Sequence, residues 1–183
     1  MDLIMSNSSM QVDSPVGMLT LVAQESALVA ILWEDDQPTR VRLGAMHTDE
    51  THPILLETER QLKEYFRGTR TCFDIPLAFS GTDFQKQVWA ALLTIPFGET
   101  RSYRDIAEQI GNVKAVRAVG AANGRNPISI IAPCHRVIGA SGDLTGFAGG
   151  LKAKEMLLLL EGHELKQKSS AVRSQLMLFE NPQ

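Results

Sequence analysis

A cysteine followed directly by a histidine is the feature of this chain best suited to nucleophilic chemistry. Cys134 and His135 stand in "IAPCHRVIGASG", after a proline and shortly before Gly139 and Gly142. A thiolate is a strong nucleophile, and an imidazole has the near-neutral pKa needed to take up the thiol proton. Adjacent side chains point apart, so this transfer would need a bridging water or a tight turn. The residues alone leave a second interpretation open, in which Cys134 is a buried small apolar residue and His135 a structural histidine.

Glu161 is the second candidate for chemistry. An apolar helix is predicted from Leu151 to Leu160, with Gly162 ending it. Glu161 would then lie in the last turn, where the helix dipole disfavours a carboxylate by about 0.3–1 kcal/mol. It is either a solvated glutamate or a carboxylate that orients His135 in a Cys–His–Glu relay. Sequence spacing does not decide between the two.

A short helix with one cationic face is predicted from about Val113 to Ala122. Residues that share a face at helical spacing are Lys114, Arg117, Ala118 and Ala121, with Val116 and Val119 toward another face. Such a face suits close approach to a nucleic acid, and a solvated surface is the alternative. The preceding helix begins at a Ser102–Asp105 cap and ends at Gly111. Together they outline a helix-turn-helix, or two helices of an ordinary bundle.

The elements that must position these residues differ between the two halves of the chain. The first half is predicted to be mixed α/β, with a hairpin of strands at 19–23 and 28–33, a helix from Pro53 to Phe66 and an edge strand at 73–79 containing Pro76. "SGT" at 80–82 is the best boundary. The second half is predicted to be helical, starting with a Thr82–Gln85 capping box. We therefore expect domains at 1–80 and 82–166 and a tail at 167–183.

Charge is distributed unevenly in this chain of 183 residues and net charge −3. Residues 1–81 carry 6 Lys+Arg against 12 Asp+Glu, and residues 82–161 carry 9 against 7. This asymmetry suggests that the second half faces a polyanion. The only two cysteines lie far apart, which argues against a disulfide framework or a structural zinc site. No signal-peptide pattern or membrane-length apolar stretch occurs, so we expect a cytoplasmic protein.

Five motifs together resemble one protein family. "FQKQVWAALLTIPFGET", "SYRDIA", "GAANGRNPI", "PCHRVIG" and "KEMLLLLEGH" stand in the order and spacing of the bacterial O6-alkylguanine–DNA alkyltransferases. The match is strong from about Thr82 to Glu161, and the first half matches in outline. The resemblance implies a small ribonuclease-H-like N-terminal α/β domain. It also implies a mostly helical, winged-helix-like C-terminal domain with a helix-turn-helix.

The resemblance also implies the reaction. An O6-alkylguanine, and by extension an O4-alkylthymine, would be flipped out of duplex DNA, and its alkyl group would pass irreversibly to Cys134 in a single turnover. The partner would be double-stranded alkylated DNA bound at its minor groove by a monomer. No metal or organic cofactor is expected, because a thiolate attacks the saturated carbon directly. The protein would be cytoplasmic and associated with the nucleoid when bound to DNA.

The family's catalytic residues have counterparts here. Cys134 matches the alkyl acceptor, His135 the base acting through a water, and Glu161 the carboxylate that holds the histidine. Asn126 matches an asparagine that fixes the turn before the active-site segment. Tyr103 matches a tyrosine that crowds the DNA backbone and hydrogen-bonds the extruded base.

The resemblance implies further contacts with DNA and with the extruded base. Arg117 matches an arginine that fills the gap left in the base stack. The other residues expected at the DNA are Lys114, Ala118, Ala121 and Arg125. The substrate pocket would include Val137, Phe147, Ala148 and Lys154, with the carbonyls of Cys134 and Val137 accepting from the guanine amino group. Phe147 and Ala148 depart from the tyrosine and serine of some members, which suggests a pocket open to groups larger than methyl.

The tail contains "QLMLF", which resembles a peptide that binds the bacterial sliding clamp. Its residues are Gln175, Leu176, Leu178 and Phe179. Leu and Phe anchors on a flexible tail could fill an apolar pocket of a partner. An amphipathic tail that folds back on its own domain is the alternative.

Three other functions remain as rivals at this point. A non-catalytic lesion-binding protein would lack the cysteine. A cysteine hydrolase would need better geometry than an adjacent nucleophile and base provide. An alkylation-sensing transcription factor would carry a four-cysteine zinc domain, for which this chain has too few cysteines.

Overall fold

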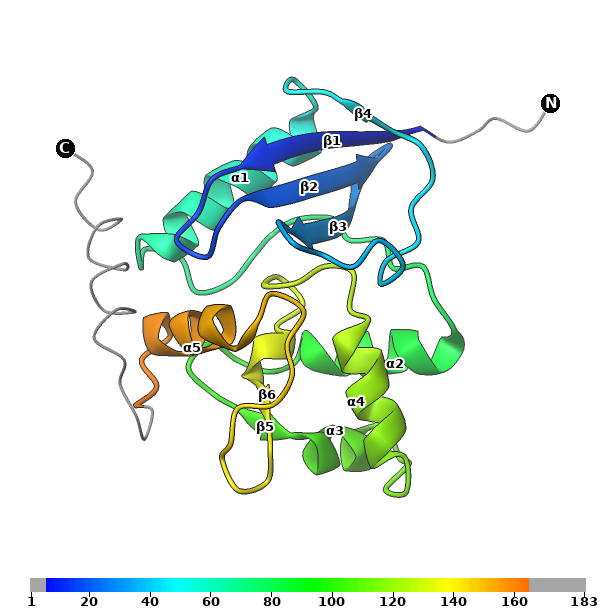
Figure 1. Ribbon diagram of the computed structural model, residues 1–183, viewed down its shortest axis with the longest axis vertical. Helices are drawn as coiled ribbons and strands as arrows, with labels where there is room; N and C mark the ends of the chain where they lie inside the picture. The colour runs from blue at the N-terminus through cyan, green and yellow to red at the C-terminus, as the bar shows by residue number, and fades with distance from the viewer. Residues whose placement is uncertain (1–5, 165–183) are drawn as a thin grey trace.

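The computed structural model describes residues 6–164, which form a sheet half above a helical half (Figure 1). The sheet half contains β1 (Asn7–Val12), β2 (Leu19–Gln24), β3 (Ala27–Trp33), β4 (Met46–Thr48) and α1 (Pro53–Phe66). The helical half contains α2 (Asp83–Leu92), β5 (Arg101–Ser102), α3 (Tyr103–Gln109), α4 (Val116–Gly124), a 3₁₀ turn (Cys134–Arg136), β6 (Val137–Ile138) and α5 (Leu151–Leu160). The order of a mixed half followed by a helical half is the one expected from the sequence.

The sheet has the strand order β3-β2-β1-β4. Neighbouring strands are antiparallel except β1 and β4, which are parallel. The predicted hairpin is confirmed as β2 and β3, and the predicted helix is confirmed as α1, which packs on one face of the sheet (Figure 1). Strands β1 and β4 are not predicted by the sequence pattern. The first is rich in serine and asparagine, and the second has only three residues, so neither shows clear apolar alternation.

The predicted strand at 73–79 is wrong. The segment makes a single bridge to β3, in which the Leu28 amide donates to the Pro76 carbonyl at 2.8 Å and the Ala78 amide donates to the Leu28 carbonyl at 2.9 Å. Pro76 has no amide to donate, so pairing does not continue past this point. The segment still covers part of the β3 edge, which would otherwise offer unpaired backbone groups.

The two predicted capping boxes of the helical half are confirmed at α2 and α3. Thr82 and Ser102 are the N-caps, and Gly111 with φ +76° follows α3. The second helix of the predicted helix-turn-helix begins at Val116, three residues later than expected. Lys114 therefore lies in the turn before α4 and not on its face. Asn112 accepts the Ala115 amide in that turn, which delays the start of the helix.

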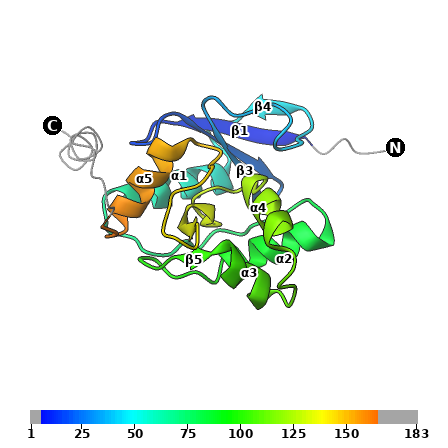
Figure 2. The same cartoon turned by 60° about the horizontal axis from the view of Figure 1, so that its bottom comes forward.

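One edge of the sheet holds a loop of the helical half. The Ile31 amide of β3 donates to the Pro127 carbonyl at 2.9 Å, and the Trp33 indole donates to the Ser129 hydroxyl at 3.1 Å. The views in Figures 1 and 2 both place this loop between the sheet and the lower helices. Residues 127–129 lead directly into the cysteine segment, so the sheet half supports that segment from behind.

Arg40 makes a charged polar contact between the halves. Its guanidinium donates to the Asn126 carbonyl at 2.7 Å and the Gly124 carbonyl at 3.4 Å. The Asp36 carboxylate accepts two bonds of 2.6 Å from the same guanidinium. The Arg40 side chain is only 10% exposed. Without this guanidinium, the Asp36 carboxylate and the carbonyls of Gly124 and Asn126 would lose a hydrogen-bond donor.

We predict that Arg40→Met lowers the free energy of unfolding by about 1–3 kcal/mol, because partly buried acceptors lose a charged donor. Arg60→Met is the matched control. Arg60 pairs with Glu57 and Glu64 on α1 but is 53% exposed, and exposed pairs contribute about 0–1 kcal/mol. Urea unfolding of both variants measures the difference. Equal losses would show that Arg40 does not fasten the two halves together.

Candidate active site

The segment before Cys134 is held in shape by one asparagine. The Asn126 side-chain oxygen accepts the Ile128 amide at 3.0 Å, and its nitrogen donates to the Ala132 carbonyl at 2.8 Å. The two ends of the loop are thereby tied to one buried side chain. Between them, Ile130 has φ +75°, a backbone conformation that costs a β-branched residue about 1–3 kcal/mol. The surrounding hydrogen bonds must offset that strain.

The cysteine and histidine project from a tight turn. The Cys134 amide donates to the Ala132 carbonyl at 2.8 Å, and residues Cys134–Arg136 form one turn of 3₁₀ helix. Cys134 is 2% exposed and His135 is fully buried. From the sequence, proton transfer between these neighbours would need a tight turn or a water, and a tight turn is present here. Cys134 packs among apolar residues of the helical half, beside Val119 and Val137 in the same cluster.

Glu161 is the centre of a buried hydrogen-bond network. Its carboxylate meets His135 Nε2 at 2.6 Å and Arg136 Nε at 2.6 Å, with a further bond from Arg136 Nη2 at 3.2 Å. The Tyr65 hydroxyl, from α1 in the sheet half, donates to the same carboxylate at 2.6 Å. Glu161 is 4% exposed, so it is not a solvated residue at a helix end. The sequence left open whether Glu161 is solvated or contacts His135. In the structure its carboxylate contacts His135.

Sequence reasoning missed two members of this network, Tyr65 and Arg136. Tyr65 lies 96 residues from Glu161, and nothing in its local pattern separates it from a core aromatic of α1. A signal for Arg136 was available, because a basic residue inside a buried segment needs an acceptor. Arg136 also donates to the Ile95 carbonyl at 2.6 Å and lies 5.8 Å from the centre of the Phe97 ring.

The charges of the network fix the protonation of His135. Burial raises the pKa of Glu161, but bonding to His135 and Arg136 outweighs it and lowers that pKa to about 2. Burial lowers the pKa of His135, so the imidazole is neutral at pH 7. Glu161 is then a carboxylate that only accepts, so Nε2 carries the hydrogen. His135 Nδ1 is left as an acceptor, and among the described residues this buried atom has no hydrogen-bond partner.

The Cys134 thiol is shielded and needs a base. Burial raises its pKa above the ordinary value, which favours the thiol over the thiolate. Hydrogen bonding by Asn126 acts in the opposite direction, as do the positive charges of Arg40 and Lys154. The free Nδ1 of the adjacent His135 is suited to take the thiol proton. The resulting imidazolium would be stabilised by the Glu161 carboxylate.

Lys154 anchors the loop in front of the site. Its ammonium is buried on α5 and donates to the Val137 carbonyl at 2.6 Å and the Thr145 carbonyl at 3.4 Å. Burial lowers the pKa of Lys154 to about 8. Thr145 is also hydrogen-bonded to the Tyr103 hydroxyl at the start of α3. These contacts bring together the pocket residues Val137 and Lys154 and the tyrosine expected at the extruded base.

Phe147 and Ala148 lie on the opposite side of this loop, toward the sheet half. The Phe147 ring meets Trp33 edge to face, with centroids 5.3 Å apart. A Cβ on Gly149 would stand 2.6 Å from the same indole, so only glycine allows this close approach. Ala148 packs against the core of the sheet half. Trp33 therefore sets the position of the loop that carries both pocket residues.

The outer face of α4 is open to solvent. Arg117, Ala118 and Ala121 are exposed, while Val119 points into the core and Val116 is partly buried. Lys114 is exposed in the turn before the helix, and Arg125 is exposed just after it. These five of the six residues expected at the DNA are thus on the surface, and the sixth, Tyr103, is half-buried. Gly120, on the same helix, lies against the Tyr103 ring and brings α3 and α4 close together.

Other expectations concern sites away from this cluster. Within residues 6–164, no three His, Cys, Asp or Glu side chains are grouped to hold a metal ion, and no helix is long and apolar enough to cross a bilayer. Cys72 is exposed and unpaired in the described part of the chain. The tail residues Gln175, Leu176, Leu178 and Phe179 lie outside the described residues.

We predict that Tyr65→Phe raises the pKa of His135. Without the tyrosine hydroxyl, the Glu161 carboxylate keeps more of its negative charge for the imidazole and favours the imidazolium. The free energy of unfolding should fall by about 1–3 kcal/mol, because a buried carboxylate loses one donor. An NMR titration of the His135 ring measures the pKa. An unchanged pKa together with lost stability would mean that the Tyr65 hydroxyl stabilises the fold without affecting the protonation of His135.

We predict a pH dependence of stability that comes from Glu161. Its folded pKa of about 2 lies below the ordinary value of 4.5, so the stabilisation is complete above pH 4.5 and is lost as pH falls toward 2. The shift corresponds to about 3 kcal/mol. Urea unfolding at pH 6 and pH 3 measures the change. Glu161→Gln should flatten this part of the profile, and an equally steep profile in the variant would contradict the assignment.

Comparisons with known proteins match both halves. A family model for the "6-O-methylguanine DNA methyltransferase, ribonuclease-like domain" matches residues 10–79. A second, for the "6-O-methylguanine DNA methyltransferase, DNA binding domain", matches residues 83–163. A methylated-DNA–protein-cysteine methyltransferase of Mycolicibacterium paratuberculosis is 52% identical over 150 residues, covering 82% of this chain and 89% of that protein.

A second relative and a solved structure give the same result. A methylated-DNA–protein-cysteine methyltransferase of Methanosarcina acetivorans is 50% identical over 151 residues, which is 82% of this chain and 95% of that protein. The crystal structure of Mycobacterium tuberculosis OGT in complex with DNA is 49% identical, with a TM-score of 0.78. It covers 85% of this chain and 92% of that chain. The expected fold class, with a ribonuclease-like first half and a DNA-binding helical second half, is confirmed.

Proposed function

The chain belongs to the 6-O-methylguanine DNA methyltransferase family, and we propose that it flips an O6-alkylguanine out of duplex DNA and transfers the alkyl group to Cys134. The class of enzyme is methylated-DNA–protein-cysteine methyltransferase, acting in DNA repair. The finer steps, namely base flipping and single-turnover transfer to this cysteine, are our proposal.

One observation carries the proposal most directly. His135 is held by Glu161 through Nε2, while its other nitrogen is buried and unpartnered within the described residues, next in sequence to Cys134. An imidazole held this way is a base that lacks only its proton donor. The thiol proton passes to Nδ1, with one water as the bridge we infer. The imidazolium and the Glu161 carboxylate then form a buried ion pair.

The alkyl transfer needs no cofactor, because the bond formed, the bond broken and the electron pair are all accounted for by the thiolate and the base. The Cys134 sulfur forms a bond to the saturated carbon as the bond from that carbon to guanine O6 breaks. The electron pair goes to the purine, which takes up a proton and leaves as guanine. A hydrogen bond to the purine from the Tyr103 side of the pocket would make it a better leaving group. The thioether product has no carbonyl for water to attack, so the protein acts once.

Reaching a base inside a duplex requires extrusion, which costs a few kcal/mol. The exposed face of α4 offers the means to offset this cost. Ala118 and Ala121 would allow the helix close to the minor groove, and the exposed Arg117 would occupy the gap in the base stack. Lys114 would contact a phosphate from the turn before α4.

We predict that incubation with an O6-methylguanine duplex adds one methyl group to the parent protein, at Cys134. Cys134→Ser should gain none, because a serine hydroxyl beside this base is far less nucleophilic than a thiolate. Cys72→Ser is the matched control and should react like the parent, since Cys72 lies outside the network. Intact-mass spectrometry with peptide mapping measures the gain. Methylation that maps to Cys72 would refute the proposal.

Several finer expectations stay predictions. They are activity on O4-alkylthymine, acceptance of groups larger than methyl, a monomeric state and a cytoplasmic location. Binding of the tail to a sliding clamp is also still a prediction, supported by its sequence pattern alone.

A further inference from the structure

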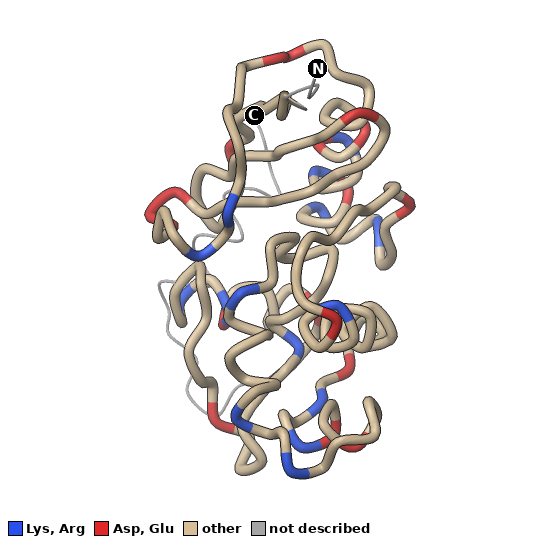
Figure 3. The backbone as a smooth tube through the Cα atoms, turned by 90° about the vertical axis from the view of Figure 1, so that its right-hand side faces the viewer, with Lys and Arg blue, Asp and Glu red and all other residues tan. Residues whose placement is uncertain are grey.

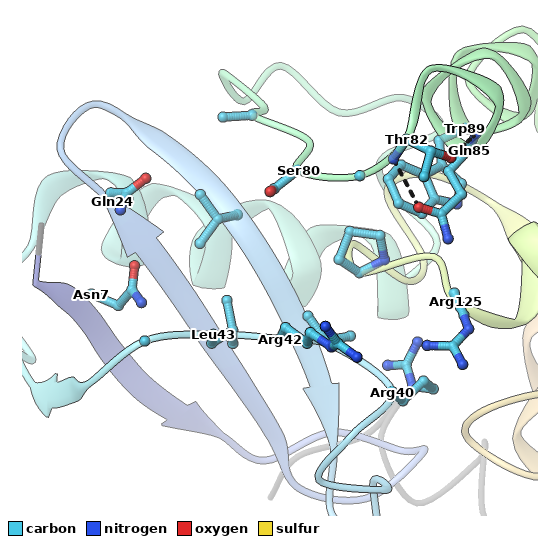
Figure 4. A pocket seen from close by; sticks show the side chains of 16 residues that line it. Asn7, Gln24, Arg40, Arg42, Leu43, Ser80, Thr82, Gln85, Trp89 and Arg125 are labelled. Atoms are coloured by element: carbon cyan, nitrogen blue, oxygen red, sulfur yellow. Dashed lines mark hydrogen bonds between the residues drawn. The ribbon is translucent and has the colours of Figure 1, made fainter.

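A groove of about 630 Å³ lies between the two halves, on the side of the β3–β4 loop. Figure 4 shows the guanidinium groups of Arg40, Arg42 and Arg125 gathered at one end of it. The other lining residues include Gln24 of β2, Ser80 of the connecting segment and Gln85 of α2. No Asp or Glu lines the groove, so its charge is positive.

Two of the three arginines are free to bind a ligand. Within residues 6–164, the side chains of Arg42 and Arg125 make no hydrogen bond or ion pair, and both are exposed. Arg40 also lines the groove, but its charge is paired with the Asp36 carboxylate. The nearby end of α2 is closed by its own Thr82–Gln85 capping box. The arginine side chains, and not a helix terminus, therefore give the groove its charge.

Arg42 is unusual for the acidic first half of the chain. Most basic residues of that half are paired with carboxylates, as Arg60, Lys63 and Arg70 are with glutamates of α1. Within the described residues of that half, Arg42 and Arg67 are the two basic side chains without a carboxylate partner, and of these only Arg42 lines the groove. Figure 3 shows several Lys and Arg positions on this side of the molecule, close to the junction of the two halves.

The groove continues the exposed stripe of α4. Arg117, Ala121 and Arg125 follow one another at intervals of four residues, and all three are exposed. Arg125 belongs both to this stripe and to the groove. A polyanion lying along α4 would therefore pass from Arg117 to Arg125 and then reach Arg42 of the sheet half. A row of arginines of this length suits an extended polyanion better than a small anion.

We propose that this arginine groove binds the phosphate backbone of the same DNA duplex that α4 contacts, beyond the C-terminal end of that helix. The sheet half thus takes part in DNA binding through Arg42. The proposal rests on the proposed function for its ligand, duplex DNA. Phosphate contacts of this kind position the duplex and do not read its sequence.

The test compares Arg42→Gln with the parent by fluorescence anisotropy, using undamaged and O6-methylguanine duplexes at several salt concentrations. Loss of one phosphate contact should weaken binding to both duplexes roughly threefold to tenfold and reduce the salt slope by about one. Arg42→Lys, which keeps the charge, should retain most of the affinity. Arg67→Gln is the matched control, because Arg67 is an exposed arginine of the sheet half outside the groove.

A series of duplexes shortened one base pair at a time, separately on each side of the lesion, locates the contact. The parent should lose affinity at one length on one side only, and Arg42→Gln should lack that step. Parallel curves for the two proteins, or an unchanged salt slope, would overturn the proposal and would favour an acidic protein as the ligand of the groove. Methyl transfer by the parent, read by intact mass, reports on the proposed function separately, so the two failures are distinguishable.

Discussion

A single buried negative charge organises this protein. The Glu161 carboxylate is taken out of water at the end of α5, where an unpaired charge would be strongly destabilising. Its donors come from α1 and from the 3₁₀ turn that carries the cysteine. Three segments distant in sequence must therefore meet at one point for the fold to be stable. The same charge fixes the hydrogen of His135 on Nε2, which leaves Nδ1 as a buried acceptor without a partner among the described residues.

The sheet half holds none of the candidate reactive groups, but it positions the segments that carry them. Trp33 supports both Ser129, in the loop before the cysteine, and Phe147, in the loop in front of it. Arg40 binds the carbonyls at the end of α4, and Tyr65 completes the carboxylate network. The strained backbone at Ile130 is held in place by these contacts and by Asn126. Reactivity thus belongs to one half, and the precision of its geometry depends on the other.

The distribution of charge follows the same division. The sheet half is acidic, but its arginines at the junction face the helical half and the end of α4. The helical half presents Arg117 on α4 and Arg125 just after it, and the buried charges of Glu161 and Arg136 are paired with each other. An acidic surface away from the DNA and a basic track toward it would orient the protein before any specific contact forms.

The sequence by itself determined much of the local structure and indicated the candidate reactive residues. Several elements depend on residues close together in the chain, so their sequence patterns predict them. They are the capping boxes at Thr82 and Ser102, the helices at Pro53–Phe66 and Leu151–Leu160, and the β2–β3 hairpin. The Cys–His pair and the five motifs pointed to the chemistry and the family for the same reason. The failures were at 73–79, at the start of α4 and at β1, where proline, turn hydrogen bonds and weak alternation decide the outcome.

Only the tertiary structure decided what Glu161 does. From the sequence it could be solvated or buried, because a helix-end glutamate tolerates the dipole easily in water. Packing of α1 against α5 removes the water and brings Tyr65 within 2.6 Å, a contact between residues 96 positions apart. The groove lined by Arg42 and Arg125 likewise exists only after the two halves meet. Long-range contacts of this kind leave no periodic trace in the chain, since each partner is locally an ordinary core or surface residue.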